Sequence, residues 1–244
     1  MKKILAILMM IIIMTITLVG CGQKEIPSSE NTTLNNELTF SEKVKNLKVD
    51  DIIKFGKYVQ YRAETDGRKE DIEWIVLEIR EDKALLLSKY ALDGAKYNEK
   101  WENTIWSTSP LRTWLNDDFF NQAFSDEEKT KIPTVTIPAD ANPDHDTPPG
   151  DATQDKIFLL SIIEVNKYLN TDIARQCIAT DYAKERGVNA RYYNNVFSSS
   201  WWLRTPGRFQ YNAAVVAHEG VIANDGIYVN YFRAVRPALW IELS

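Results

Sequence analysis

The chain has 244 residues, of which 44% are hydrophobic and 26% are charged, and its formal net charge at pH 7 is −5. This composition is typical of a folded globular protein, and a domain of this size can bury a large core. The negative net charge argues against nucleic acid and against an anionic membrane surface as binding partners.

The first twenty residues have the pattern of a secretory signal. Lys2 and Lys3 give a positively charged start, and an apolar run that only threonines interrupt extends to Val19. The run is short for a permanent membrane span, and polar sequence follows it at once. We therefore predict that residues 1–20 are a signal peptide.

The signal ends in Leu18-Val-Gly-Cys21, which resembles the lipobox of bacterial lipoproteins. The resemblance implies that Cys21 becomes the mature N-terminus and is diacylated on its sulfur. Two acyl chains hold a protein stably in a lipid bilayer, so we expect a protein anchored on the extracytoplasmic side of the cell membrane. The other cysteine, Cys177, then has no disulfide partner, and we expect it to be a small buried hydrophobic residue.

Residues 21–48 are rich in Ser, Asn, Thr, Glu and Lys and contain few large apolar residues. Burial in such a segment cannot offset the entropy lost on ordering, so we predict a flexible, lipidated tether. Residues 38–47 have apolar positions at the spacing of a short helix. A single globular domain is then predicted over residues 49–244.

The domain begins with patterns that are typical of β-strands. Residues 51–61 form one such run, and residues 72–79 and 84–88 form two more that are rich in β-branched and aromatic side chains. Arg80-Glu-Asp-Lys83 between the last two runs predicts a hairpin loop.

Helix signals follow. Ser109-Pro110 is an N-cap before a proline at the first helical position. Ser125-Asp-Glu-Glu128 and Ser161-Ile-Ile-Glu164 are capping boxes. A further helix over residues 181–186 should stop at Gly187.

The C-terminal part returns to strands, and the Asn224-Asp225-Gly226 tripeptide predicts a tight turn between two of them. Together the patterns predict an α+β fold, a mixed domain with an antiparallel C-terminal sheet. The predicted strands of that sheet are residues 201–203, 213–217, 221–223, 227–232 and 235–241.

A loop over residues 139–155 is rich in Asp, Asn, Pro and Gly. Its Asn142-x-Asp144-x-Asp146 spacing resembles the first part of a calcium-binding loop, so Asp144 and Asp146 are candidate calcium ligands. The glycine and the terminal glutamate of such a loop are missing, which leaves a solvated surface loop as the alternative. No other cofactor is expected.

Other residue types point to structure rather than chemistry. His145 and His218 do not form a helical His-x-x-x-His pair, which argues against zinc. Arg204 and Arg236 lie in aromatic strand sequences, where we expect structural ion pairs, with stacking on a ring as the alternative. Most tryptophans should belong to the core. The sequence contains no nucleophile elbow, phosphate-binding loop or dinucleotide motif, so no catalytic residue is predicted.

Six motifs in combination resemble a bacterial family of domains of unknown function that is common in secreted proteins and lipoproteins of Gram-positive anaerobes. The resemblance runs from about Val49 to Leu243, and the family has no assigned activity. The motifs are Ile72-Glu-Trp-Ile-Val-Leu77, Leu87-Ser-Lys-Tyr90, Leu111-Arg-Thr-Trp-Leu-Asn116, Ile157-Phe-Leu-Leu-Ser161, Trp201-Trp-Leu-Arg-Thr-Pro-Gly207 and Val235-Arg-Pro-Ala-Leu-Trp240.

The last two motifs are also similar to those of C-type-lectin-like folds, including the sulfatase-modifying and formylglycine-generating relatives. This similarity implies a C-type-lectin-like domain with a ligand surface at its C-terminal strands. Formylglycine-generating enzymes use two active-site cysteines, and this domain has only Cys177, so the resemblance does not extend to their oxidative chemistry.

The anchor, the tether and the lack of a catalytic motif predict a binding module for a glycan, peptidoglycan or a protein ligand. The candidate contact residues are Arg208, Phe209, Tyr211 and His218. One alternative is an extracytoplasmic enzyme that acts on wall polymers with carboxylates of the acidic loop. Another is a structural partner in an envelope complex, which an exposed apolar patch would favour.

Overall fold

A computed structural model describes residues 40–61 and 67–243, which fold as a mixed α+β unit with two five-stranded sheets, two two-stranded ribbons and short helices. The predicted signal peptide, Cys21 and most of the predicted tether lie outside the described residues. No helix in the described part of the chain is long and apolar enough to cross a membrane.

The first sheet is built around the hairpin that the sequence predicts. Arg80 pairs with Lys83, so Glu81 and Asp82 form the hairpin loop. All neighbouring strands in this sheet are antiparallel. In spatial order the strands are β1 (Ile52–Val59), β2 (Lys69–Arg80), β3 (Lys83–Ser88), β14 (Ala238–Glu242) and β7 (Ile157–Phe158).

The second sheet contains most of the C-terminal strands. Its strand pairs are antiparallel, as predicted, except that the central strand is parallel to one neighbour at Trp201 and Ala234. In spatial order the strands are β12 (Ile222–Tyr228), β11 (Asn212–Val216), β10 (Trp201–Pro206), β13 (Phe232–Val235) and β4 (Asp93–Lys96).

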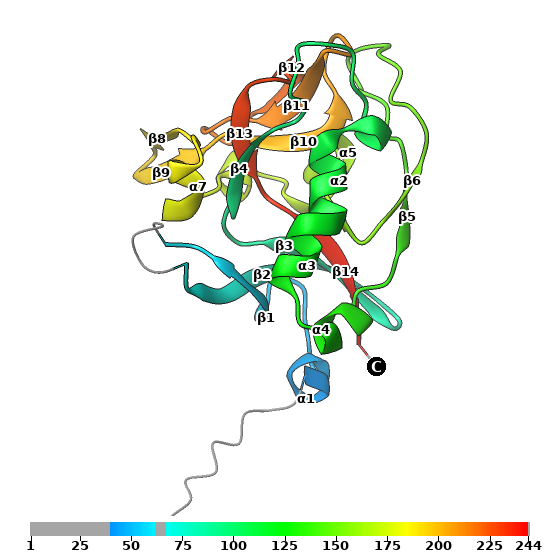
Figure 1. Cartoon of the computed structure of the whole chain (residues 1–244), viewed down its shortest axis with the longest axis vertical. Coiled ribbons are helices and arrows are strands. Elements are labelled where there is room, and N and C mark those ends of the chain that lie inside the picture. Colours follow the sequence, from blue (N-terminus) through cyan, green and yellow to red (C-terminus); the bar gives the residue numbers. More distant parts are fainter. Residues whose placement is uncertain (1–39, 62–66, 244) are drawn as a thin grey trace, which may run out of the picture. The chain divides into compact units, whose positions relative to one another are not determined.

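The helices are short, and the two predicted capping boxes are both present, with Ser125 and Glu128 at one helix start and Ser161 and Glu164 at another. Figure 1 shows α2 and α3, joined by a π-helical turn, as one rod that runs between the levels of the two sheets. The helices are α1 (Phe40–Val44), α2 (Pro110–Trp114), α3 (Phe120–Ala123), α4 (Asp126–Thr130), α5 (Ile162–Tyr168), α6 (Asp172–Arg175) and α7 (Asp181–Glu185).

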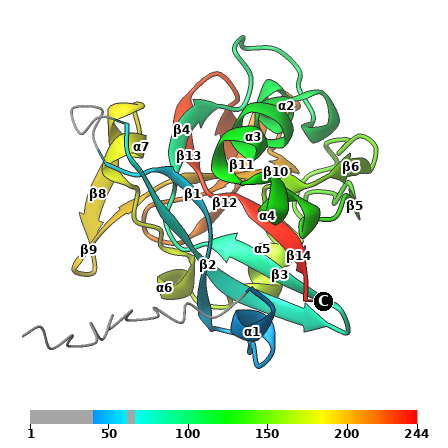
Figure 2. The ribbon, with the colours of Figure 1, turned by 60° about the horizontal axis from the view of Figure 1, so that its bottom comes forward.

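Two ribbons complete the fold. β5 (Val135–Ile137) pairs with β6 (Thr153–Asp155) at the two ends of the acidic loop. β8 (Ala190–Tyr193) pairs with β9 (Val196–Ser199), and Figure 2 shows this ribbon beside α7 at one side of the fold.

Helix α1 packs on the domain although its residues fall within the predicted tether. The ring of Phe40 lies 5.2 Å from the ring of Phe55, and Val44 is buried. The packed part of the chain therefore includes residues before Val49.

Most tryptophans belong to the core or pack against it, as expected. Trp201 and Trp202 are adjacent in β10, yet both are fully buried, because both faces of this central strand are covered. The indole N–H of Trp202 donates to the carbonyl oxygen of Ala95 at 2.9 Å, and that of Trp201 donates to the carbonyl oxygen of Arg175 at 3.0 Å. Both buried indole N–H groups thus have a hydrogen-bond partner, as burial favours.

The predicted turn at Asn224-Asp225-Gly226 is wrong. Ala213 pairs with Ile227 and Val215 pairs with Ala223, so β12 continues through these three residues as a bulge. The bulge forms because β11 remains paired on both sides of it, and Gly226 supplies the positive φ of +69°.

The predicted last strand, residues 235–241, is two strands in different sheets. Val235 ends β13 in the second sheet and Ala238 begins β14 in the first. The chain crosses between the sheets at Arg236-Pro237, since proline has no N–H with which to continue a ladder.

The predicted ion pair of Arg204 is present. This side chain is almost completely buried, and its guanidinium donates to Asp140 Oδ2 at 2.8 Å and to both carboxylate oxygens of Glu164. It also donates to the carbonyl oxygen of Leu159 at 2.9 Å. The guanidinium therefore joins β10 to the N-terminus of α5 and to the acidic loop.

The predicted ion pair of Arg236 is wrong within the described part of the chain. Its guanidinium lies 5.0 Å from the centre of the Trp201 ring, and its Nε donates to the carbonyl oxygen of Ser88 at 3.0 Å. The cation is held by an aromatic face and a carbonyl, which is the stacking alternative.

Replacing Arg204 with alanine should lower the free energy of unfolding by about 3–5 kcal/mol, because the change leaves two partly buried carboxylates without their cation. Urea unfolding measures this loss. Lys184→Ala is the control, since Lys184 forms an exposed ion pair with Asp181 and its loss should cost under about 1 kcal/mol. Equal effects of the two substitutions would contradict the role given to Arg204.

Glu78 in β2 predicts a pH dependence of stability. Burial opposes its ionisation, but hydrogen bonds from Arg80, Tyr168 and Lys167 lower its pKa to about 2. A carboxyl group whose pKa is lower in the folded state stabilises the fold above its unfolded pKa, and that stabilisation disappears as the pH falls toward the folded pKa.

The free energies of unfolding of wild type and Glu78→Gln should therefore differ most above pH 4.5, the ordinary pKa of the group, and converge as the pH approaches 2. Urea unfolding at a series of pH values measures the difference. If the difference in free energy of unfolding stays constant over this pH range, the ionised Glu78 carboxylate does not stabilise the fold.

Candidate functional site

Three loops meet at one end of the second sheet. They are the β10–β11 loop (residues 207–211), the β12–β13 loop (residues 229–231) and the segment that follows β4 (residues 97–105). The amide of Thr104 donates to the carbonyl oxygen of Gln210 at 2.8 Å. The backbone amide of Asn98 likewise donates to the carbonyl oxygen of Val229 at 2.9 Å. Backbone hydrogen bonds therefore hold the three loops together.

Two glycines allow the β10–β11 loop to approach β12 closely. A Cβ atom added at Gly207 would lie 2.4 Å from the carbonyl oxygen of Asp225. One added at Gly226 would lie 2.5 Å from the carbonyl oxygen of Ala213 and 3.0 Å from the Cα of Gly207. Neither position has room for a side chain, so this contact between the loop and the bulge of β12 requires glycine on both sides.

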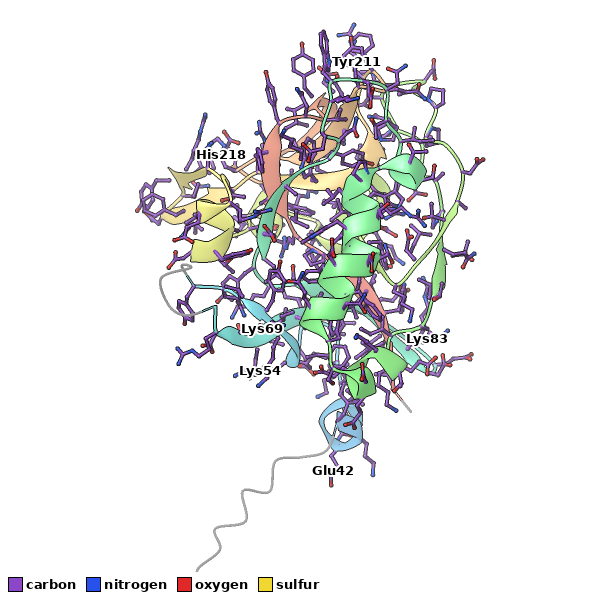
Figure 3. All side chains as sticks on the ribbon, in the orientation of Figure 1. Glu42, Lys54, Lys69, Lys83, Tyr211 and His218 are labelled. Atoms are coloured by element: carbon purple, nitrogen blue, oxygen red, sulfur yellow. The ribbon has the colours of Figure 1, made fainter. Side chains whose placement is uncertain are left out.

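The three loops and the last residue of β12 present five aromatic rings that contact one another, and we call them the aromatic cluster. The Phe209 and Tyr211 rings are stacked with their centres 5.1 Å apart. The Trp101 ring contacts Tyr211 and Tyr228 at 5.6 and 5.5 Å. The Tyr228 ring contacts Tyr231 at 5.5 Å. Figure 3 shows Tyr211 and the side chains around it at the upper end of the molecule.

Four of the five rings of the aromatic cluster, all but Tyr211, are exposed to solvent. The exposed fraction is 61% for Trp101, 48% for Tyr231 and 47% for Phe209. The guanidinium groups of Arg208 and Arg233 lie 5.6 Å from the Phe209 ring and 6.0 Å from the Tyr231 ring. The row of rings therefore has a cation at each end.

A shallow pocket of about 500 Å³ adjoins Phe209 and Tyr211, and we call it the His145 pocket. Its other lining residues include Asn103, Asp146 and Gln210, whose polar side chains surround this part of the surface. The Nε2 atom of His145 lies 2.6 Å from Asp225 Oδ1. The pocket places hydrogen-bonding groups directly beside exposed aromatic faces, a combination that binding sites for small ligands use.

The structure brings together three of the four predicted contact residues. Arg208, Phe209 and Tyr211 share the β10–β11 loop, whereas His218 lies in the β11–β12 turn, well apart from Tyr211 in Figure 3. His218 lines a different pocket.

Trp101, Tyr228 and Tyr231 are not among the contact residues that the sequence predicts. Tyr228 ends a strand and Tyr231 lies in the next loop, positions at which aromatic side chains often remain outside the core. Most tryptophans are expected in the core, and no local pattern marks Trp101 as an exception. Only the fold shows that its loop packs on the β10–β11 loop.

The predicted calcium ligands lie on the acidic loop near the aromatic cluster. Asp146 lines the His145 pocket, and the carboxylate of Asp144 accepts a hydrogen bond from the side chain of Asn224. In the described residues, no group of three or more His, Cys, Asp or Glu side chains is arranged to hold a metal ion.

Buried titratable groups elsewhere have structural partners. Asp93 accepts a hydrogen bond from the Tyr58 hydroxyl at 2.7 Å, and burial raises the pKa of this carboxyl although Tyr58, Gly94 and Arg186 oppose the shift. Asp155 accepts from Trp106 at 2.9 Å and from Arg112 at 2.7 Å.

The remaining cysteine of the domain is likewise enclosed. Cys177 is buried, as expected, and burial raises the pKa of its thiol. A buried thiol with a raised pKa is a poor nucleophile.

Comparison with known proteins identifies the family. Residues 81–243 match a family described as a domain of unknown function, DUF6273, so the match begins later than the predicted start near Val49. No curated protein and no solved structure matches the chain at a significant level. Because the family match covers most of the chain and includes every ring of the aromatic cluster, the chain belongs to the DUF6273 family.

Proposed function

We propose that this protein is an extracytoplasmic, lipid-anchored binding module that recognises a cell-wall glycan through the aromatic cluster. The observation that carries the proposal is the row of five contacting rings, three of which are about half exposed. Exposed apolar surface that is contiguous indicates a partner that covers it. Aromatic faces are suited to the C–H faces of sugar rings, and tyrosine adds a hydroxyl for hydrogen bonding.

The surroundings of the rings support a sugar ligand. Asn103 and Gln210 in the His145 pocket offer amide groups to sugar hydroxyls, and Arg208 offers a guanidinium. The backbone hydrogen bonds between the loops keep the rings in place before the ligand arrives, which reduces the entropy lost on binding. A C-type-lectin-like domain, which the C-terminal motifs suggest, would bind its ligand at loops of this kind.

Replacing Trp101 or Tyr211 with alanine should weaken binding of the ligand by about tenfold or more, because each change removes a central aromatic contact. The measurement is calorimetric titration of the full chain in detergent with soluble fragments of peptidoglycan and of wall polysaccharide. Phe197→Ala is the matched control, since Phe197 is 60% exposed and contacts Tyr192 on the β8–β9 ribbon.

If the variants unfold at the same temperature as the wild type, their weaker binding does not result from a loss of folding. If the wild type binds neither polymer, the glycan proposal is wrong, and cross-linking on intact cells would then seek a protein ligand. The same titrations with calcium and with a chelator test the predicted role of Asp144 and Asp146. Binding that persists in chelator would show that the site needs no calcium.

Replacing Cys21 with serine should abolish lipid attachment and release the protein from the membrane, because the proposed thioether anchor needs the cysteine sulfur. Metabolic labelling with a fatty acid and fractionation of cells measure both effects. Cys177→Ala, which changes the other cysteine, should leave labelling intact. Labelling that survives Cys21→Ser would overturn the proposed anchor.

A further inference from the structure

The pocket that contains His218 has a different character from the aromatic cluster, and we call it the Arg191 pocket. It has a volume of about 320 Å³ and lies between the β8–β9 ribbon and strands β11, β12 and β13. The Tyr193 ring contacts the His218 ring at 6.3 Å, and the Ser198 hydroxyl donates to the carbonyl oxygen of His218. These contacts hold the ribbon against the β11–β12 turn.

Two arginines from separate elements line the Arg191 pocket. Arg191 lies on β8 and Arg233 lies on β13. Arg191 and Tyr193 are two residues apart in a strand, so both side chains project from the same face of the ribbon, the face that Tyr193 turns toward His218. The ribbon thus brings a second guanidinium to a pocket that already contains Arg233.

Neither arginine has a carboxylate partner among the residues that the structure describes. Arg233 donates to the carbonyl oxygen of Phe232 at 2.6 Å and lies over the Tyr231 ring. The carboxylate of Glu219, which also lines the pocket, lies 3.0 Å from His218 Nε2. Burial and the nearby charge of Arg191 lower the pKa of Arg233, in a chain whose net charge is −5.

Two like charges that share a pocket repel each other, and a bound anion relieves that repulsion. Guanidinium groups bind carboxylate and phosphate oxygens through paired N–H donors. The rest of the lining includes apolar surface from Val215, Ile227 and Phe232. The pocket is therefore suited to an acidic group that is attached to a partly apolar body.

We propose that the Arg191 pocket binds the carboxylate or phosphate group of an acidic ligand between Arg191 and Arg233. Arg233 lies beside Tyr231, the last ring of the aromatic cluster, so the pocket is positioned to take an acidic substituent of a glycan that covers the rings. The choice of wall-derived probes rests on the proposed function, whereas the charge of the pocket does not.

The test uses pairs of probes that differ only in the acidic group. N-acetylmuramic acid carries a lactyl carboxylate that N-acetylglucosamine lacks, and glycerol 3-phosphate carries a phosphate that glycerol lacks. Ligand-observed NMR titrations of the full chain in detergent should give at least one acid a dissociation constant of about 1 mM or lower. Its neutral counterpart should bind at least about tenfold more weakly, and the acid that binds identifies the group.

Arg191→Gln and Arg233→Gln should each remove most of this difference between acid and neutral probe. Arg68→Gln is the control, because Arg68 is 70% exposed and pairs with Glu70 far along the sequence from the pocket. Thermal unfolding of each variant checks that the fold is intact. Raised salt should also weaken binding of the acid more than binding of the neutral sugar.

Three results would overturn the proposal. They are equal binding of acid and neutral probes, unchanged acid binding in both arginine variants, and no acid binding up to about 10 mM. A different result would show that the proposed glycan-binding role of the aromatic cluster is wrong. In that case Trp101→Ala would leave binding of wall polymer unchanged. The two sites are therefore tested separately.

Discussion

The buried guanidinium of Arg204 is the contact on which the arrangement of the domain depends. Its side chain binds Asp140 of the acidic loop and Glu164 at the start of α5, while its backbone amide donates to Leu160 and its carbonyl oxygen accepts from the Tyr97 hydroxyl. Three segments that are distant in sequence, around Tyr97, Asp140 and residues 160–164, thus meet at one residue of the central strand. A buried cation requires such partners, and few other arrangements of the chain would supply them.

The position of the aromatic cluster follows from these contacts. The acidic loop, tied to Arg204 at Asp140, continues along the second sheet, where the Asn142 amide donates to the carbonyl oxygens of Pro206 and Asn224. The Thr147 hydroxyl then donates to the carbonyl oxygen of Arg208. Because the acidic loop is bonded to the end of β10 at Pro206 and to the bulge of β12 at Asn224, it supports the close approach of the β10–β11 loop to that bulge. The exposed rings are therefore carried by backbone segments that hydrogen bonds from the acidic loop hold in place.

Features that depend on local chemistry could be predicted from the sequence, whereas those that depend on neighbours could not. Both capping boxes and the β2–β3 hairpin follow from residues within a few positions of each other. The tripeptide Asn224-Asp225-Gly226 has the local pattern of a turn, so the sequence predicts one. It forms a bulge instead, because β12 pairs with β11 on both sides of it. Likewise, no local pattern reveals that Trp101 is exposed while Trp201 and Trp202 are buried, since burial depends on which elements cover a strand.

The distribution of charge around the aromatic cluster likewise depends on which distant segments the fold brings together. The chain is acidic overall, so a long anionic polymer is repelled at a distance and must be held by short-range contacts. Arg208 lies with Asp146 and Asp225 at the Phe209 end of the aromatic cluster, so charges of both signs meet there. Arg233 lies at the Tyr231 end, with Arg191 beyond it. A ligand with an acidic group at one end would be attracted more strongly in the orientation that brings this group to Arg233 and Arg191. Aromatic contacts would then supply affinity, and the unequal charges would set the direction in which the ligand lies.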